Sequence, residues 1–515
     1  MFKSDSRPTP GISAKRVDAL LLAAWMAATS GAIDAAAQTA HPESVPTYHG
    51  HTDRSGNFVV PGLTPEKARL LHLDRGFNAV VSGHVYAQPL YWRVPASASG
   101  MLLVATEENR VYALDAGTGK ELWQRAIGKP VARSTLGCGN VDPLGITGTP
   151  AIDEAGEALY LDAMTQSASD PRHRVFALSL KDGEVISGWP VDVTEALEAH
   201  KQDFSARDQN QRGALSILDG KLYVPFGGHF GDCGQYHGLV LGISLKDPRE
   251  VASWATRGRG GGIWAPGGIS SDGRSLFVTT GNTLAVTSWA DGQAVFRLAP
   301  DLHRSQDKRD FFAPPYWREL DDTDADLGGT NPIPLDLPTP SGVQPVVLAL
   351  GKDRHAYLLD RNNLGGIGGG LAATIVARNT IRTAPAAYPA DDGVFVAFQG
   401  AGAQCPRPAT DNNLTVLKLR AGSPPSIATA WCGALRGSGA PIVTTTDGRS
   451  NPIVWIAGAE GDNRLHGFAG ESGQPLFTGG GPQEAMVGVR RFQTLIAAQD
   501  RFYVAADGRV YAFGF

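Results

Sequence analysis

Residues 102–123, LLVATEENRVYALDAGTGKELW, form a hairpin-building unit that constrains the fold more than any other stretch of the chain. Two apolar runs, at 102–105 and 111–115, flank a polar break, as expected for two paired β-strands. A GTGK turn follows, in which glycine supplies the positive φ that a tight turn needs, and Trp123 ends the next apolar run. Weaker copies of this unit recur to the last residue. The sequence therefore predicts a series of small antiparallel sheets.

The copies share one pattern: an entry of small residues or proline, a β-rich strand, a polar turn and a second strand. Entries recur roughly every 50 to 65 residues. Eight entries are recognised, beginning at Ala87, Gly148, Gly213, Trp264, Thr330, Thr383, Gly439 and, least clearly, Phe492. A four-stranded sheet repeated radially is a β-propeller, in which each sheet packs on its neighbours around a central channel. The pattern predicts an all-β fold, a single eight-bladed β-propeller.

The composition agrees with many short strands joined by turns. Of 515 residues, 63 are glycine and 34 proline, and only 19% are charged, so long helices are expected to be scarce. The formal net charge is -5 and no basic block occurs, which argues against nucleic acid as a partner.

The N-terminus carries basic residues, then an apolar run at 19–28 and a small-residue stretch at 35–37. This pattern predicts an export signal over 1–37 and a periplasmic or secreted protein. An uncleaved membrane anchor is the alternative, although the apolar core is short for a span and no other stretch approaches membrane length. Residues 38–83 are predicted to be a lead-in that supplies the ring-closing strand, and 84–515 the propeller.

An exported chain makes disulfides possible among its four cysteines, Cys138, Cys233, Cys405 and Cys432. Three connectivities exist, and we favour Cys405 with Cys432, because 27 residues correspond to about one hairpin out and back. No CxxC or CxxCH motif occurs, which argues against a covalently attached c-type haem and a cysteine-based zinc site.

The stretch VYALDAGTGKELW, residues 111–123, resembles the tryptophan-docking repeat of the pyrroloquinoline quinone (PQQ) propellers, the quinoprotein alcohol dehydrogenase-like family. At the level of the repeat, the resemblance covers essentially the whole mature chain. The same repeat also builds non-catalytic periplasmic scaffolds, such as the outer-membrane assembly lipoprotein. The repeat therefore supports the fold without fixing an activity.

Four residues carry a more specific likeness to the catalytic members of that family. Trp264 is followed 18 residues later by Asn282. Asp324 lies 42 residues further on, in an acidic loop, and Lys352 follows after another 28 residues. The resemblance implies that Trp264 forms the floor under the quinone, that Asn282 ligates calcium and that Lys352 contacts the quinone oxygens. It also implies that Asp324 is the catalytic base.

The chemistry of these residue types is compatible with that role. Calcium prefers several oxygen ligands, which Asn282 and one or two of Asp322, Asp324 and Asp326 offer. The function implied is PQQ- and calcium-dependent oxidation of an alcohol or sugar hydroxyl, with Asp324 taking the proton. Because no haem motif is present, electrons would pass to a separate acceptor such as a cytochrome.

The chain also departs from the family pattern. The calcium-ligating glutamate is missing from the comparable stretch 231–240, where Asp232 is the nearest substitute. One cysteine, Cys138, stands where two adjacent ones are expected over the quinone. The alternative function is therefore a non-catalytic periplasmic binding or assembly propeller with a degenerate cofactor site.

Each candidate also has an ordinary structural explanation. Trp264 could pack between blades, Asn282 could simply tolerate a left-handed turn, and Lys352 could be a surface charge in a hairpin. The acidic loop at 321–326 could be solvated. A third functional class is a hydrolase or lyase at the channel mouth that uses this loop with His229 and His237. The spacing of these histidines fits no standard zinc pattern, and a loop held by a Cys233 disulfide is favoured.

Overall fold

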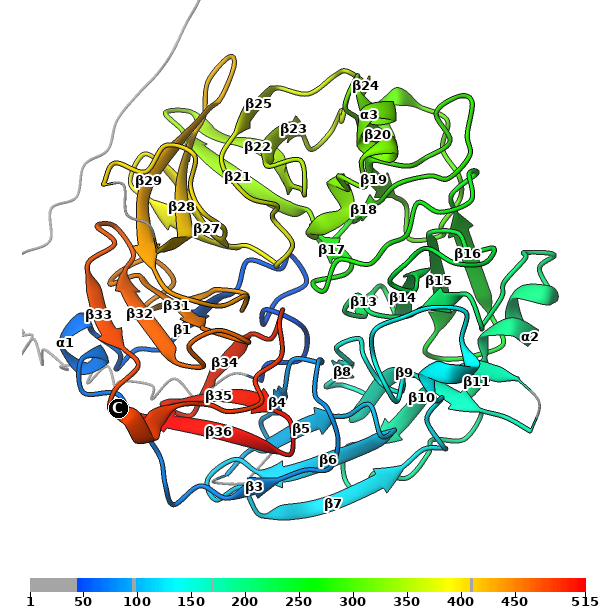
Figure 1. Ribbon diagram of the computed structural model, residues 1–515, viewed down its shortest axis with the longest axis horizontal. Helices are drawn as coiled ribbons and strands as arrows, with labels where there is room; N and C mark the ends of the chain where they lie inside the picture. Colours follow the sequence, from blue (N-terminus) through cyan, green and yellow to red (C-terminus); the bar gives the residue numbers. More distant parts are fainter. Residues whose placement is uncertain (1–43, 95–98, 169, 408–410) are drawn as a thin grey trace, which may run out of the picture. The chain divides into compact units, whose positions relative to one another are not determined.

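The computed structural model describes residues 44–94, 99–168, 170–407 and 411–515. Within these residues the strands form eight sheets, which follow one another around a ring (Figure 1). The predicted eight-bladed β-propeller is confirmed. The predicted export signal at 1–37 lies outside the described residues. In the described part of the chain, no helix has the length and apolar character needed to cross a membrane.

The first four sheets are built from successive parts of the chain, apart from one strand of sheet 4 that comes from residues 366–367. Sheet 1 contains β4 (Leu90–Trp92), β5 (Met101–Ala105), β6 (Arg110–Asp115) and β7 (Glu121–Ala126). Sheet 2 contains β8 (Ala151–Asp153), β9 (Ala158–Gln166), β10 (Pro171–Ser179) and β11 (Val191–Asp192). Sheet 3 contains β12 (Gln209–Asn210), β13 (Ser216–Leu218), β14 (Lys221–Gly228), β15 (Leu239–Ser244) and β16 (Val251–Ala255). Sheet 4 contains β17 (Ser270–Ser271), β18 (Leu276–Thr280), β19 (Ala294–Leu298), β20 (Phe311–Ala313) and β24 (Gly366–Ile367).

The remaining sheets complete the ring, and two of them also take strands from the lead-in. Sheet 5 contains β21 (Ile333–Thr339), β22 (Gly342–Leu350), β23 (His355–Asp360) and β25 (Ala372–Ile375). Sheet 6 contains β26 (Ala386–Ala390), β27 (Gly393–Gln399), β28 (Asn412–Arg420) and β29 (Ser426–Ala434). Sheet 7 contains β1 (Asn57–Val59), β30 (Ile442–Thr445), β31 (Ile453–Ala457), β32 (Leu465–Ala469) and β33 (Pro475–Thr478). Sheet 8 contains β2 (His72–Leu73), β3 (Ala79–Val80), β34 (Leu495–Ala498), β35 (Arg501–Ala506) and β36 (Arg509–Gly514).

Helices are short and lie in connections between strands. The α-helices of the described residues are α1 (Pro65–Ala68), α2 (Val193–Glu198) and α3 (Trp317–Asp322). Single 3₁₀ turns occur at Arg133–Thr135, Lys308–Asp310, Leu327–Gly329 and Pro482–Glu484.

The hairpin unit folds as its sequence predicts. Met101 pairs with Asp115 and Ala105 with Val111, so β5 and β6 form the expected antiparallel hairpin. Gly119 has φ +78° in the turn before β7. A Cβ on Gly119 would lie 2.7 Å from the backbone of Ala79, so glycine is required there both by conformation and by space.

Neighbouring sheets are joined by an aromatic side chain on one sheet and a turn on the next. Trp431, on β29, donates its indole N–H to the carbonyl of Gly470 at 2.6 Å and packs on Gly473 in sheet 7. Trp123, on β7, makes the equivalent contact with Leu180 and Gly183 in sheet 2. These contacts bury large apolar area between sheets, and they explain why tryptophan and glycine recur in the repeat.

Segments near the two ends of the propeller close the ring. β2 and β3 pair with β36, with His72 opposite Gly514 and Ala79 opposite Val510. Residues from the lead-in thus form the outer strand of the last sheet. The described residues belong to one compact unit, Pro42–Phe515, and the domain boundary at residue 83 stays a prediction.

The segment 45–56 fills the channel, a feature that the sequence pattern did not predict. Drawn in blue, it crosses the centre of the ring in Figure 1. It bonds in turn to the first strands of several sheets, for example through the carbonyl of Pro46 to Ile152 N–H and that of Ser55 to Ala387 N–H. The fully buried Arg54 bonds to the backbone carbonyls of Leu215 and Ile269, which lie directly before the neighbouring sheets' strands β13 and β17, and this ties the segment in place.

The tryptophan contact between sheets can be tested by a pair of glycine substitutions. A Cβ on Gly473, at φ +70°, would lie 2.6 Å from Trp431, whereas Gly448, at φ +91°, has no neighbouring atom within 4 Å. Both positions carry the left-handed backbone cost, so only Gly473→Ala adds a clash. We expect Gly473→Ala to lower the free energy of unfolding by about 1–3 kcal/mol more than Gly448→Ala does.

The measurement is urea denaturation of both variants beside the unsubstituted protein, followed by tryptophan fluorescence. Equal destabilisation by the two substitutions would show that the packing of Trp431 on Gly473 contributes nothing beyond the conformation of the turn.

Candidate functional site

A cavity of about 460 Å³ lies where the chain enters the first strands of the sheets; we call it the channel cavity. The loops that line it come from every sector of the ring. Its lining includes Tyr86, Asn140, Val141, Thr147, Asn210, Arg212, His229, Phe230, Asp232, Tyr236, Trp264, Asn282, Asp324, Asp326, Lys352, Arg382, Glu460, Arg490, Arg491 and Phe492.

The structure brings all five residues singled out in the sequence to this cavity: Trp264, Asn282, Asp324, Asp326 and Lys352. They belong to four separate segments. Trp264 lies in the loop before β17, Asn282 in the loop between β18 and β19, the two aspartates in the connection from β20 to β21, and Lys352 in the turn between β22 and β23. Their convergence is the arrangement that the enzymatic interpretation of the sequence required.

Glycines allow these loops to approach so closely. A Cβ on Gly281 would lie 2.9 Å from the carboxylate of Asp326, and one on Gly328 would lie 2.7 Å from the backbone of Thr280. Any larger residue at these positions would push the loops apart.

Asp326 is the centre of the site. Its side chain accepts hydrogen bonds from the backbone N–H of Asn282 at 2.8 Å and from the indole N–H of Trp264 at 3.2 Å. It also forms an ion pair with Lys352, with a nitrogen to oxygen distance of 2.7 Å. Asp326 is only 2% exposed, and burial raises the pKa of its carboxyl to about 6, although Lys352 opposes the rise.

Asp324 differs from Asp326 in the exposure of its carboxylate, although both pair with Lys352. Its side chain is 64% exposed and forms an ion pair with Lys352, with a nitrogen to oxygen distance of 2.8 Å. Its backbone has φ 51°, which turns the chain between the two carboxylates. The role of Asp324 as catalytic base stays a prediction, and the geometry favours Asp326 for that role.

Lys352 is largely buried rather than a surface charge. Its ammonium group bridges Asp324 and Asp326 and lies 5.2 Å from the ring centroid of Trp264. Burial acts to lower the pKa of Lys352, but the two carboxylates outweigh it and the pKa is raised. Lys352 is therefore a permanent positive charge at neutral pH.

Asn282 is held through its backbone, which leaves its side chain free to face the cavity. Its N–H is bonded to Asp326 and its carbonyl accepts the N–H of Gly261 at 2.7 Å. Among the described residues its side-chain amide has no hydrogen-bond partner, although the residue is only 6% exposed. The amide oxygen is available to a ligand.

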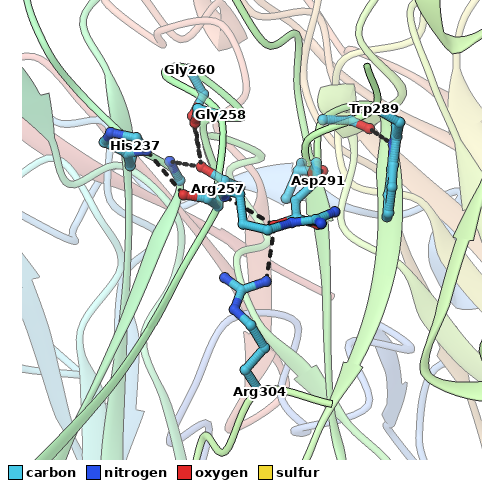
Figure 2. A network of polar contacts seen from close by, with 11 residues as sticks. His237, Arg257, Gly258, Gly260, Trp289, Asp291 and Arg304 are labelled. Carbon is cyan, nitrogen blue, oxygen red and sulfur yellow. Dashed lines mark hydrogen bonds and ion pairs between the residues drawn. The ribbon is translucent and has the colours of Figure 1, made fainter. Parts of the chain in front are cut away.

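A polar network behind the cavity fixes the two loops that carry Trp264 and Asn282. Figure 2 shows Asp291 between the guanidinium groups of Arg257 and Arg304, at 2.7 and 2.9 Å. The backbone carbonyl of Asp291 also accepts the hydroxyl of Thr280, two residues before Asn282. Because one buried carboxylate joins residues from both loops, their relative position is rigid.

Two disulfides are formed, Cys138 to Cys233 and Cys405 to Cys432. The second confirms the favoured pairing, and the first confirms that a Cys233 disulfide holds the loop at the channel mouth. The cystine at Cys138 joins two loops beside the cavity, one of which carries Asp232. Asp232 accepts the hydroxyl of Tyr236 at 2.5 Å.

The two histidines of the Cys233 loop are occupied by backbone contacts. His229 interacts through Nε2 with the carbonyl of Arg207, and His237 through Nδ1 with the carbonyl of Thr256. Of these two histidines, His229 lines the cavity. In the described part of the chain, no group of three or more histidine, cysteine or acidic side chains is close enough to hold a metal ion.

The sequence did not identify the cations on the other side of the cavity, Arg212, Arg382, Arg490 and Arg491. Arg212 and Arg382 each stand directly before an entry of the repeat, as Tyr86 and Thr147 do. Comparison of the residues directly before each entry of the repeat would have identified Arg212 and Arg382. Arg491 also stands directly before an entry, at Phe492, whereas no repeat position marks Arg490. Their partners, Glu460 and Asp507, lie 31 and 17 residues away in the chain.

The comparisons with known proteins agree with this architecture. Residues 66–254 match the family described as outer membrane protein assembly factor BamB. The structure is similar to quinohemoprotein alcohol dehydrogenase from Comamonas testosteroni, with 16% identity and a TM-score of 0.64 over 91% of this chain and 80% of that one. A quinohemoprotein alcohol dehydrogenase from Pseudomonas putida HK5 gives 14% identity and a TM-score of 0.64 over 92% and 80% of the two chains.

A europium-containing methanol dehydrogenase is also similar, with 13% identity and a TM-score of 0.60 over 91% of this chain and 90% of that one. No curated protein matches the chain. The chain therefore has the eight-bladed propeller fold of these dehydrogenases. The resemblance drawn from the repeat is confirmed at the level of the fold, because identities this low show the fold and not the chemistry.

The pairing of Asp326 with Lys352 can be tested by titration. Trp264 donates to Asp326, so the fluorescence of Trp264 should report ionisation of that carboxyl with a midpoint near pH 6. In Lys352→Met the midpoint should move to higher pH, because the cation that favours the carboxylate is gone. The measurement is the pH dependence of the fluorescence difference between each protein and its Trp264→Phe derivative. An unchanged midpoint would contradict the electrostatic coupling.

Proposed function

We propose that this propeller binds PQQ in the channel cavity and oxidises a hydroxyl group of an alcohol or sugar. The observation that carries the proposal is the convergence of Trp264, Asn282 and Lys352 around the buried carboxyl of Asp326. A buried carboxyl with a pKa near 6, held in a ligand-sized cavity, is the arrangement expected of a general base.

The residues present fit the quinone. PQQ is a planar molecule with three carboxyl groups, so its site needs an aromatic surface and cations. Trp264 offers the surface, and Arg212 and Arg382 are guanidinium groups without an acidic partner among the described residues. The cavity volume of about 460 Å³ is within the range usual for small-molecule sites.

The residues fit calcium less completely. Asn282 and Asp326, with Asp324 beside them, would supply oxygen ligands, but calcium prefers six to eight. Lys352 already pairs with both carboxylates, so calcium would have to displace its ammonium group. Calcium binding at these three residues stays part of the proposal, and no step of the mechanism depends on it.

Asp326 would accept the proton of the substrate hydroxyl, and PQQ when bound would supply the hydride acceptor. Lys352 keeps Asp326 ionised near neutral pH in spite of its burial. The hydrogen bonds from Trp264 and Asn282 fix the carboxylate in one orientation. Asp326, rather than the exposed Asp324, is therefore our candidate for the base.

The proposal places the reaction in the periplasm and requires a separate electron acceptor, such as a cytochrome, because the sequence has no CxxCH haem motif.

The second candidate function is a binding or assembly propeller without a cofactor. It is favoured by the family match over residues 66–254 and by the absence of a second cysteine beside Cys138.

Calorimetric titration of PQQ into the mature protein, with and without calcium, tests the proposal. We expect binding that Trp264→Ala abolishes, because the aromatic floor is lost. Trp317→Ala is the matched control, because it removes a tryptophan that does not line the cavity. Absence of binding at high micromolar PQQ would reject the quinoprotein function and favour the binding propeller.

The pH dependence of turnover tests the base. Only ionised Asp326 can accept a proton, so kcat/KM should rise with pH and level off above about 6, falling tenfold per unit below. Asp326→Asn should abolish turnover. Asp324→Asn should move the acid limb to lower pH, because the charge of Asp324 raises the pKa of Asp326. Loss of turnover in Asp324→Asn with retention in Asp326→Asn would restore Asp324 as the base.

A further inference from the structure

Arg212 is a cation of the channel cavity whose N–H groups have no acceptor among the described residues. The residue directly precedes the entry of sheet 3 and lines the cavity. Its guanidinium carbon lies 4.5 Å from the ring centroid of Phe492 and 5.7 Å from that of Trp264. Within the described residues it makes no hydrogen bond and no ion pair. Aromatic rings are therefore its close partners.

The other cations of the cavity behave differently. Lys352 pairs with Asp326, Arg490 with Asp507 and Arg491 with Glu460. The remaining unpaired cation, Arg382, is exposed at the rim and can be solvated. Arg212 alone combines partial burial with the lack of an acid among the described cations of the cavity.

This arrangement costs stability in the free protein. Burial lowers the pKa of Arg212 to about 10, while Tyr86 and Glu107 oppose that effect. The nearby Arg491 and Arg382 lower the pKa further by repulsion. A buried charge is normally retained only where it is paired, so an unpaired one at a ligand cavity points to an absent anion.

A second donor lies beside Arg212. A small cavity of about 10 Å³ is lined by Arg212, Phe492 and Tyr48. Tyr48 is 2% exposed, and its buried hydroxyl has no hydrogen-bond partner among the described residues. Two donor groups without a partner among the described residues, from different segments, thus line the same small cavity.

We propose that Arg212 receives a carboxylate group of the molecule that binds in the channel cavity. A planar guanidinium matches a carboxylate through two parallel hydrogen bonds. The ring faces of Trp264 and Phe492 beside the guanidinium favour a flat group over a tetrahedral one. The exposed Arg382 adds attraction at the cavity rim. The carboxylate belongs either to PQQ or to an acidic substrate such as a uronic acid, and in the second case the inference does not depend on the proposed cofactor.

The first arm of the test addresses the cofactor. PQQ and its trimethyl ester are titrated into the full mature protein, Arg212→Met and Arg212→Lys. If Arg212 receives a PQQ carboxylate, the protein should bind the acid more tightly than the ester. Arg212→Met should bind the acid about 10 to 100-fold more weakly, with the ester unaffected, because a hydrogen bond to a charged group is lost. Arg212→Lys should recover part of the loss.

The second arm addresses the substrate. D-Galacturonate and neutral D-galactose, which differ at one carboxylate, are titrated into the same proteins. A preference for galacturonate that disappears in Arg212→Met assigns the carboxylate to an acidic substrate. This result would stand even if PQQ does not bind, so failure of the proposed function is distinguishable from failure of this inference.

Thermal unfolding without ligand shows whether the variants are folded. Arg212→Met should melt at or above the temperature of the unsubstituted protein, since an unpaired charge has been replaced by an apolar side chain of similar length. Arg382→Met is the matched control at the rim and should weaken acid binding less than Arg212→Met. The inference is overturned if neither acid binds, or if folded Arg212→Met keeps the full preference for either acid over its neutral partner.

Discussion

Closure of the ring is the constraint on which the rest of this structure depends. A four-stranded sheet of a propeller is apolar on both faces, and each face is covered only by the next sheet. The core accordingly runs across sheet boundaries, as where Leu103 of sheet 1 and Leu161 of sheet 2 share one cluster. At the junction of the last and first sheets, the hydroxyl of Tyr503 donates to the carbonyl of Ala116 at 2.7 Å. An open ring would leave two apolar faces in water.

A closed ring encloses a channel, and the lead-in segment occupies part of that channel. Residues 45–56 follow the first strands around the axis and fill the channel beside them. Arg54, although fully buried, is satisfied by the carbonyls of Ile269, Tyr48 and Leu215. The space that remains is the channel cavity, and a second, small cavity is lined by Tyr48, Arg212 and Phe492. Burial of the ionisable side chains explains why the pKa of Asp326 is raised and that of Arg212 lowered.

The cavity holds two charged side chains, Asp326 and Arg212, whose hydrogen-bonding environments are opposite. Asp326 has three donors, from Trp264, Asn282 and Lys352, and it is fixed in one orientation. Arg212 has aromatic neighbours and no acceptor among the described residues. A satisfied carboxyl is suited to a chemical role, whereas an unsatisfied guanidinium is suited to binding, since the ligand itself completes the site.

The sequence alone determined the repeat and the number of blades, because alternating apolar runs and glycine turns act over a few residues. It also pointed to Trp264, Asn282, Asp324, Asp326 and Lys352, since their spacing matched a known family pattern. Only the tertiary structure distinguished Asp326 from Asp324, two residues apart in one acidic loop, because burial depends on how Gly281 and Gly328 let separate loops meet. It also placed the lead-in inside the channel and the arginines around the cavity. Arg212 and Arg382 share one position of the repeat, but only ring closure, which brings together residues hundreds of positions apart, places them at one cavity.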